Sequence, residues 1–336
     1  MDNPSALVIG TMRITYNVGF KPKVFLVVLV VLVLVTISRW KSCINLYLED
    51  RNHLERTHFV CMPLQGRLAN QMFQYAFIYA FSKEKELVMT LLETETENIL
   101  LPTFNMRANP FPKFKYCSCL SRYEDDWDCA YDIKFEKMEK RQDVFLHGYF
   151  QSWKYWKCYE NEIREKFQFQ KHVRTTAAVI LQSIIKKSET RIARGDILVG
   201  IHIRRGDYTK PGIFTEFGYT TATEEYLQKA TNYFRDHYRN PTFIVCSNDI
   251  TWSRKALGRY SDVYFAEGNT PETDMALLTM TNHTIMTVGT FGWWSAFLTN
   301  GTTLYYKHPF VPDSAFSKQF NGDISEHFYP GWIGMD

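Results

Sequence analysis

The sequence has almost no excess of either charge: 39 lysine and arginine residues stand against 36 aspartate and glutamate residues in 336. Proteins that hold nucleic acids carry a basic face, so this balance argues against a nucleic-acid partner. The chain also lacks internal repeats and, after one N-terminal apolar run, low-complexity tracts, which excludes a solenoid. We therefore expect one large or two medium globular domains.

The glycine fingerprint of dinucleotide-binding folds is missing as well. The turn after the first predicted strand of the body reads GRLANQ, from Gly66 to Gln71, rather than G-x-G-x-x-G. A nicotinamide cofactor is therefore disfavoured. A helix that begins directly after a strand still offers backbone amides to an anion, and Arg67 adds a positive charge. We expect Gly66, Arg67, Asn70 and Gln71 to face an anionic ligand, with a plain helix-start turn as the alternative.

Only one apolar run is long. It covers Val24 to Ile37, and the wider span from Phe20 to Trp40 reaches the roughly 30 Å that a helix needs to cross a bilayer. The run ends without a small-x-small cleavage site, which disfavours a cleaved signal peptide. Basic residues flank both ends, namely Lys21, Lys23, Arg39 and Lys41, so the positive-inside signal is weak.

We therefore expect an uncleaved signal anchor at residues 24–40, with a cytoplasmic tail at 1–23 and a short stem at 41–57. The remaining chain would then lie on the luminal side as a single-pass type II membrane protein. A cleaved signal peptide is the alternative.

The seven cysteines are an odd number: Cys43, Cys61, Cys117, Cys119, Cys129, Cys158 and Cys246. In an oxidising lumen the middle four could form disulfides, while at least one thiol stays free or pairs with another chain. A disulfide at Cys43, close to the membrane, is conceivable, and a homodimer stays open. Zinc at Cys117, Cys119 and Cys129 is disfavoured, because this spacing is not a usual ligand pattern.

Two sequons predict N-glycosylation, at Asn282 and at Asn300. Such triplets also occur by chance. Asn282 adjoins a predicted buried strand, so Asn300 is the better candidate.

Strand-like and helix-like segments alternate along the body. The first part has a strand at 58–64, a turn at 65–70, a helix at 71–82, a polar stretch at 94–132 and a strand at 144–148. The second part has strands at 197–201, 242–246, 263–265, 284–288 and 303–306. Its helices are expected at 223–238, 251–257, 271–280 and 291–298, with Thr223 as the cap of the longest. This alternation predicts two doubly wound parallel-sheet domains, at 58–195 and 196–336, that face each other across a cleft.

The most informative segment is GIHIRRGDY, from Gly200 to Tyr208. Two adjacent arginines follow an apolar strand, and His202 to Asp207 are expected on its exit loop, where ligands sit in open α/β sheets. Each guanidinium offers a fork of donors that matches two phosphate oxygens and stays charged.

We expect Arg204 and Arg205 to hold a diphosphate without a metal. Asp207 would lock one arginine, His202 would donate to an anion or orient a neighbour, and Gly206 would allow a close backbone approach. The alternative is a surface loop with a salt bridge.

Further polar groups follow later predicted strands. Ser247, Asn248 and Asp249 follow the predicted strand at 242–246. Asp274 lies in the predicted helix at 271–280. A carboxylate in either place could accept the two adjacent N–H groups of guanine. The turn of Thr290, Phe291 and Gly292 begins a late helix directly after a strand, so its amides could also bind phosphate.

Residues after the strand at 144–148 are candidates for sugar binding. Trp153 could stack on the apolar face of a galactose, while His147 and Gln151 supply hydrogen bonds. Core packing is the alternative for the aromatic side chains. The acidic string from Glu124 to Asp128 contains an Asp-x-Asp pattern that could hold a divalent metal. We expect a solvated acidic loop there instead, and no metal site.

Five segments, in order, resemble the motifs of the α1,2-fucosyltransferases, glycosyltransferase family 11: GRLANQMFQYAF, HGYFQSWKYW, GIHIRRGDY, SNDITW and DMALLTMTNHTIMTVGTFGWWSAFL. The resemblance covers most of the chain from about His58 to Trp332. It implies a GT-B-like fold of two facing α/β domains. It also implies a metal-independent enzyme that needs no cofactor, uses GDP-β-L-fucose as donor and inverts the anomeric centre. Galactose-terminated glycans would be its acceptors and the Golgi membrane its location.

Carried over by this resemblance, His202, Arg204, Arg205 and Asp207 match the donor-binding motif, with Arg204 at the β-phosphate. The first-domain turn matches as well, except that Ala69 stands where the family usually has glycine. If that position needs a positive φ or a very close donor approach, alanine costs roughly 1 kcal/mol.

Two other functions fit parts of the pattern. One is a membrane-anchored glycan-binding protein that kept the fold and lost catalysis. The other is a protein O-fucosyltransferase, which shares the His-x-Arg-Arg-x-Asp string and would transfer to a folded protein domain.

Overall fold

The computed structural model describes residues 7–9, 12–14, 22–51, 57–92, 98–106, 117, 119–187 and 196–336. The chain forms two compact units. One consists of Met1–Arg56 with Phe114–Cys119, and the other of Thr57–Lys113 with Leu120–Asp336. The predicted tail at 1–23 lies largely outside the described residues, as do 52–56 of the predicted stem and parts of the polar stretch at 94–132.

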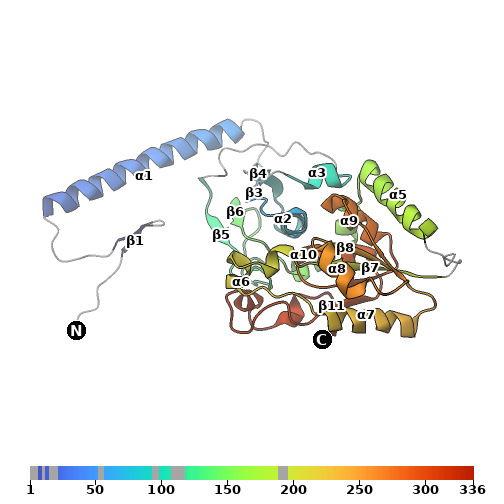
Figure 1. The fold of residues 1–336 in the computed structure, drawn as a ribbon. Helices are drawn as coiled ribbons and strands as arrows, with labels where there is room; N and C mark the ends of the chain where they lie inside the picture. Colours follow the sequence, from blue (N-terminus) through green and yellow to red (C-terminus); the bar gives the residue numbers. More distant parts are fainter. Residues whose placement is uncertain are drawn as a thin grey trace. The chain divides into compact units, whose positions relative to one another are not determined.

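The first unit is dominated by one long helix, α1 (Pro22–Arg51), which is drawn in blue in Figure 1. Its span Val27–Leu46 is long and apolar enough to cross a membrane, and none of that span is buried. An exposed helix of this composition is a candidate signal anchor. The helix continues to Arg51 and does not end near Trp40, so the first part of the predicted stem is helical. Two short strands, β1 (Leu7–Ile9) and β2 (Met12–Ile14), pair antiparallel before it.

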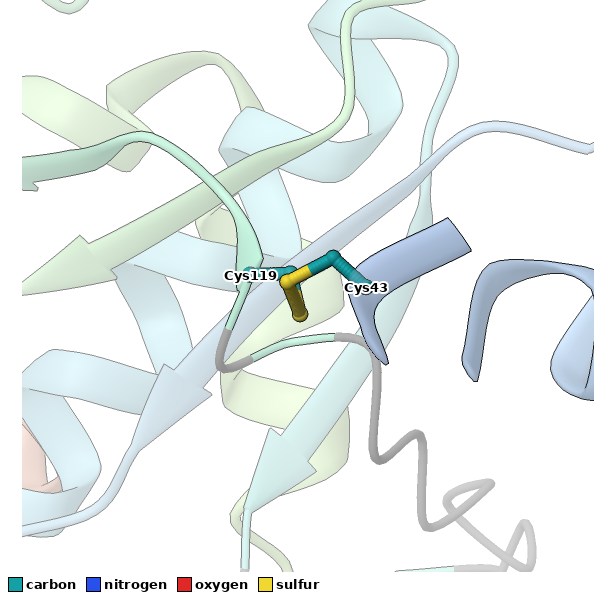
Figure 2. The surroundings of a disulfide bond; sticks show 2 residues. All are labelled: Cys43 and Cys119. Atoms are coloured by element: carbon teal, nitrogen blue, oxygen red, sulfur yellow. A yellow bond between two sulfur atoms is a disulfide. The ribbon is translucent and has the colours of Figure 1, made fainter. Parts of the chain in front are cut away.

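A disulfide joins Cys43, on α1, to Cys119, as Figure 2 shows. Cys61 and Cys117 are also disulfide-bonded. Because Cys43 is paired within its own chain, it is not available to link two copies. The zinc alternative is wrong, since Cys117 and Cys119 are oxidised. Among the described residues the free thiols are those of Cys129, Cys158 and Cys246, so the expectation of at least one unpaired cysteine is confirmed.

The second unit contains two sheets, and the smaller has four parallel strands in the order β4-β3-β6-β5. Its strands are β3 (Phe59–Pro63), β4 (Val88–Leu92), β5 (Arg122–Glu124) and β6 (Val144–His147). Strand β3 is buried throughout, because its apolar run FVCMP lies in the middle of the sheet. The sequence predicted β3 and β6 but missed β4 and β5, which lie at the edges and are partly exposed.

The larger sheet has six parallel strands in the order β12-β11-β10-β7-β8-β9. Its strands are β7 (Leu198–Ile203), β8 (Thr242–Ser247), β9 (Val263–Phe265), β10 (His283–Met286), β11 (Thr303–Tyr306) and β12 (Ile333–Met335). The predicted parallel α/β architecture with two sheets is therefore confirmed. The domain boundaries at 195 and 196 stay a prediction.

Helices cover both faces of this sheet. On one face lie α5 (Lys171–Lys187), α9 (Pro271–Thr279) and α10 (Thr290–Thr299), and on the other α7 (Glu224–His237) and α8 (Ile250–Leu257). Figure 1 shows β7 and β8 between α5 and α7. Thr223 accepts a hydrogen bond from the Tyr226 amide, so the predicted cap of α7 is confirmed. The shorter helical segments are α3 (Leu100–Thr103), η2 (Trp153–Tyr159), α4 (Glu160–Lys166), η3 (Gly206–Thr209), α6 (Ile213–Phe217), η4 (Ser317–Phe320) and η5 (Ile324–Glu326).

One aromatic core connects the small sheet to α10. Phe73, on α2 (Leu68–Lys85), contacts Trp293 and Trp294 at ring-centroid distances of 4.8 and 5.0 Å. Trp156 stacks on Trp294 at 5.3 Å. The three tryptophans are fully buried. Burial of such large side chains fixes α2 against α10.

The cysteine pairing gives a first prediction. On a nonreducing gel the full-length chain should run as a monomer, and its nonreduced peptide map should contain Cys43 linked to Cys119. Cys158→Ser removes the exposed free thiol and is the control for disulfide exchange during preparation. A dimer band that persists in this variant and disappears with reductant would contradict the pairing.

Candidate functional site

Three parallel strands end at one edge of the large sheet. In register, His202 of β7 lies opposite Cys246 of β8 and Met286 of β10. The loops that follow are tied together by two hydrogen bonds. The Arg204 amide donates to Thr287 Oγ1 at 2.9 Å, and the Arg205 amide donates to Asn248 Oδ1 at 2.8 Å. Side chains from three loops therefore meet where α/β sheets bind ligands.

The Arg204 guanidinium is held in place on two sides. Its Nη2 donates to Asp207 Oδ2 at 2.6 Å, and it lies 4.8 Å from the centroid of the Tyr208 ring. The predicted lock between Asp207 and an arginine is therefore present. Tyr208 was not selected from the sequence as a partner of this arginine.

The Arg205 side chain has its own partners. Its Nη1 donates to Thr221 Oγ1 at 3.0 Å, its Nε lies 3.9 Å from Asp249 Oδ2, and its guanidinium stacks over Trp252 at 4.2 Å. Such contacts keep a planar cation pre-organised. Sequence reasoning missed Thr221 and Trp252, and the only signal was the position of Trp252 one turn after the Ser-Asn-Asp string.

The segment from Arg204 to Asp207, which follows β7, is called the arginine loop here. Gly206 is the residue of this loop at which a side chain would fit least well. Its φ is +28°, and a Cβ there would lie 2.5 Å from Asn248 Nδ2. That amide also lies 3.4 Å from Asp207 Oδ1, to which it donates. A side chain at Gly206 would displace Asn248 and thereby release the Arg205 backbone.

The turn of the small sheet reaches the same loops. Thr290 Oγ1 donates to Asn70 Oδ1 at 2.8 Å, and Arg67 Nη2 lies 3.7 Å from Asp207 Oδ2. The Arg67 side chain is 77% exposed, so it remains accessible to a ligand. Gly66 has φ +73°, and a Cβ there would lie 2.6 Å from Asn70 Nδ2. The structure thus brings Gly66, Arg67 and Asn70 to the arginine loop.

Two neighbours on this turn differ from expectation. Gln71 is fully buried, donates to the Gly66 carbonyl and accepts from the Ile99 amide, so it supports the turn and does not face a ligand. Ala69 lies in the first turn of α2 and is not among the residues with positive φ. The helix begins at Leu68, earlier than predicted, so alanine causes no backbone strain here.

His202 belongs to β7 and not to the exit loop, so its expected position was wrong. Its ring is buried and stacks on Phe291, with ring centroids 4.9 Å apart. Burial, with a smaller contribution from the Arg204 charge, lowers the pKa of His202 to about 3. The imidazole is therefore neutral at physiological pH and adds no positive charge. Gly292 makes room for this ring, because a Cβ there would lie 2.8 Å from His202 Nδ1.

The predicted guanine ligands lie near the end of β8. Asp274, on α9, accepts a hydrogen bond from Asn269 Nδ2 at 2.9 Å, and burial raises its pKa. The Cys246 thiol donates weakly to the Asp274 carbonyl at 3.9 Å. Ser247 Oγ accepts from the Asp249 amide at 2.9 Å. Asp274 and the segment from Ser247 to Asp249 thus both lie at the sheet edge where Arg205 is found.

The three predicted acceptor residues are engaged with other parts of the fold. His147 Nδ1 lies 2.7 Å from Glu124 Oε2. Gln151 is buried, and its Oε1 accepts from the Cys129 thiol at 3.5 Å. Trp153 packs against Tyr329 at 5.6 Å. Of the three, His147 has the most accessible polar group, and the roles of all three toward an acceptor stay predictions.

The acidic string is not a fully solvated loop. It begins with the last residue of β5, Glu124, and Asp125 Oδ2 accepts from the Phe150 amide at 2.8 Å. Burial raises the pKa of Asp125 to about 8, so this carboxyl is largely protonated near neutral pH. Asp126 is exposed and pairs with Lys134 at 2.7 Å. The protonated, buried Asp125 is a poor ligand for a divalent metal.

Gly206→Ala should weaken binding of the diphosphate that we expect at the arginine loop, for which GDP is the probe, by about tenfold, because it combines an unfavourable φ with displacement of Asn248. Calorimetric titration of the purified protein measures the effect. Gly322→Ala is the matched control, since Gly322 has φ +81° but no atom within 4 Å of the place that a Cβ would take. Equal GDP affinity in the two variants would show that the Asn248 contact is irrelevant to binding.

Most of the chain is similar to proteins of one family. The family model described as Glycosyl transferase family 11 matches residues 30–336. The galactoside alpha-(1,2)-fucosyltransferase 2 of Hylobates lar is 34% identical over 285 residues, covering 80% of this chain and 77% of the relative. The galactoside 2-alpha-L-fucosyltransferase SEC1 of Bos taurus is 31% identical over 298 residues, covering 84% and 75%.

Among solved structures, a mutant form of Arabidopsis thaliana FUT1 in complex with GDP superposes with a TM-score of 0.49 at 12% identity, over 82% of this chain and 81% of that one. The match to the family model extends over the arginine loop, the Asn70 turn and the start of α10 together. On the matches to the family model and the relatives, the chain belongs to glycosyltransferase family 11.

Proposed function

We propose that this protein transfers L-fucose from GDP-β-L-fucose to the 2-hydroxyl of a terminal β-galactose, with inversion at the anomeric carbon and without a metal. The observation that carries the proposal is the pair of guanidinium groups at the end of β7, each fixed by its own partners. The family assignment and the names of the relatives support fucosyl transfer to galactose.

In this proposal the donor diphosphate lies against the arginine loop. Arg204 and Arg205 bind its oxygens, and the exposed Arg67 closes on it from the opposite turn. The N-terminus of α10, with Thr290, offers backbone amides. Guanine then extends toward the end of β8, where Asp274 and Ser247 lie.

The reaction is an in-line displacement. The galactose 2-oxygen forms a bond to C1 of fucose while the bond from C1 to the β-phosphate oxygen breaks, and its electron pair leaves with GDP. Arg204 and Arg205 stabilise the negative charge that develops on the departing diphosphate, in the place where a metal would otherwise act.

The acceptor proton needs a base, and there are three candidates. Asp207 Oδ2 already accepts a hydrogen bond from Arg204 and forms an ion pair with Arg67, and Asp207 Oδ1 accepts from Asn248. His147 is accessible but is paired with Glu124. The departing phosphate oxygen is the third candidate, and it lies at the reaction centre because the bond to C1 breaks there.

We further propose a single-pass type II arrangement in the Golgi membrane, with the catalytic body in the lumen. Disulfides persist in oxidising compartments, so the Cys43–Cys119 bond supports a luminal position for that end of α1. Cys43 follows residue 40, the predicted end of the anchor, and lies near the C-terminal end of the apolar span Val27–Leu46, so the proposal needs the membrane-crossing part of α1 to end before Cys43.

A glycan-binding protein that kept the fold and lost catalysis is the alternative. Its sequence signature would be loss of the paired arginines, and Arg204 and Arg205 are both present. Damage to the donor site at Ala69 is one route to it, but Ala69 sits in a regular helical turn and causes no backbone strain there. A protein O-fucosyltransferase differs from the proposal in its acceptor, so an assay of acceptor use separates the two.

The test is an assay of the full-length chain in detergent with GDP-fucose, phenyl β-galactoside and a chelator. We expect GDP release together with an α1,2-linked product. Loss of product on chelation would contradict the metal-free mechanism. Transfer to a folded protein domain but not to the galactoside would favour the O-fucosyltransferase.

In the same assay, Arg204→Ala should lower turnover by about 10² to 10³, by analogy with the loss of one oxyanion-hole donor. Arg254→Ala is the control, since Arg254 is half exposed and pairs with Glu267 on the surface. Near-normal turnover of Arg204→Ala would show that Arg204 does not stabilise the leaving group.

A further inference from the structure

A pocket of about 130 Å³ opens at the C-terminal end of α10. Phe297, Tyr329 and Trp332 line it with their aromatic side chains, and Arg164 and Asn300 are the polar residues among its lining. The reaction site lies at the opposite end of the same helix, which has 10 residues and is therefore about 15 Å long. The pocket is thus too far from the arginine loop to hold the galactose that reacts.

Contacts among its lining residues hold the pocket in place, and some of these residues are polar. The Arg164 guanidinium lies 3.8 Å over the Phe297 ring and donates to the Phe297 carbonyl. Glu160 accepts from Arg164 and also from the Tyr329 hydroxyl. Aromatic faces with a few fixed polar groups suit the apolar face and hydroxyls of a pyranose ring.

Asn300 stands at this pocket as the first residue of the sequon Asn300-Gly301-Thr302. It is the C-cap of α10 with φ 59°, in the left-handed region that asparagine tolerates. Its side chain is exposed, and its Oδ1 accepts from Arg164 Nη2 at 3.2 Å. The Asn300 Nδ2 is thus the glycan attachment atom nearest to the aromatic walls.

The second sequon is built differently. Asn282 Oδ1 accepts from the Leu198 amide at 2.9 Å and so fixes the start of β7. Asn282 is not among the residues that line this pocket. It therefore offers an internal comparison with Asn300.

We propose that Asn300 carries an N-linked glycan and that the first N-acetylglucosamine of this glycan sits in the pocket of Phe297, Tyr329 and Trp332. In the attachment step, the amide nitrogen of Asn300 forms a bond to C1 of N-acetylglucosamine. The bond from C1 to the diphosphate of a lipid-linked oligosaccharide breaks, and the amide loses a proton. The inference rests on the luminal location that belongs to the proposed function.

The seated sugar has a measurable consequence. An amidase that cleaves the asparagine–sugar bond needs access to that bond, so the pocket should protect it in the folded protein and not after denaturation. We expect native release from Asn300 to be at least about tenfold slower than release from the denatured chain, because release then requires local opening. Glycopeptide mass spectrometry of the full-length chain from mammalian cells measures both rates at Asn300 and at Asn282.

Variants separate the pocket from the sequon. Asn300→Gly keeps the left-handed cap and should lose the glycan, whereas Thr302→Ser keeps the sequon and should retain it. Trp332→Ala should raise the native release rate toward the denatured rate. Trp332→Leu is the milder version in case the alanine variant does not fold, and the thermal midpoint reports folding of both.

An unmodified Asn300, or equal release rates before and after denaturation, would overturn the proposal. None of these readouts uses fucosyl transfer. A chain that is active but unmodified at Asn300 refutes the glycan site alone, and a glycosylated, protected chain without transfer refutes only the proposed function.

Discussion

The packing of α2 against α10 through Phe73, Trp293 and Trp294 is the interaction on which the site depends. These rings join the core of the small sheet to a helix of the large sheet. Their burial fixes the starts of both helices, so that Asn70 and Thr290 come within hydrogen-bond distance. Apolar packing therefore positions the turns of Asn70 and Thr290, which lie next to the arginine loop.

The second constraint is parallel strand direction. Because β7, β8 and β10 run the same way, their following loops emerge at one edge and supply partners for two adjacent arginines. Arg204 is held by Asp207 and Tyr208, while Arg205 is held by Thr221, Asp249 and Trp252. Guanidinium groups that are already held in place need not rearrange when negative charge develops on a departing diphosphate. The same geometry buries His202, which fills space against Phe291 and carries no charge.

Much of this could be predicted from the sequence where the signal is local. The apolar run before Arg204, the cap at Thr223 and the turn at Gly66 each follow from neighbouring residues. Contacts between distant segments could not be predicted in this way. Nothing near Arg205 in sequence points to Thr221 or Trp252, and seven cysteines allow too many pairings to select Cys43 with Cys119.

Misplaced expectations also have physical causes. His202 was expected after its strand because it is polar, yet a neutral imidazole can be buried on an aromatic ring. Gln151 Oε1 accepts from the Cys129 thiol inside the core, and its role toward a sugar stays a prediction. At Ala69 the condition of a positive φ is not met, because the helix begins at Leu68, three residues earlier than predicted.

The most direct test of the central claim compares the binding of GDP and guanosine by calorimetry in the presence of a chelator. If the arginine pair holds the diphosphate, the wild-type protein should prefer GDP, and the double variant Arg204→Ala, Arg205→Ala should lose that preference while still binding guanosine. A double variant that retains the full preference for GDP would contradict the account.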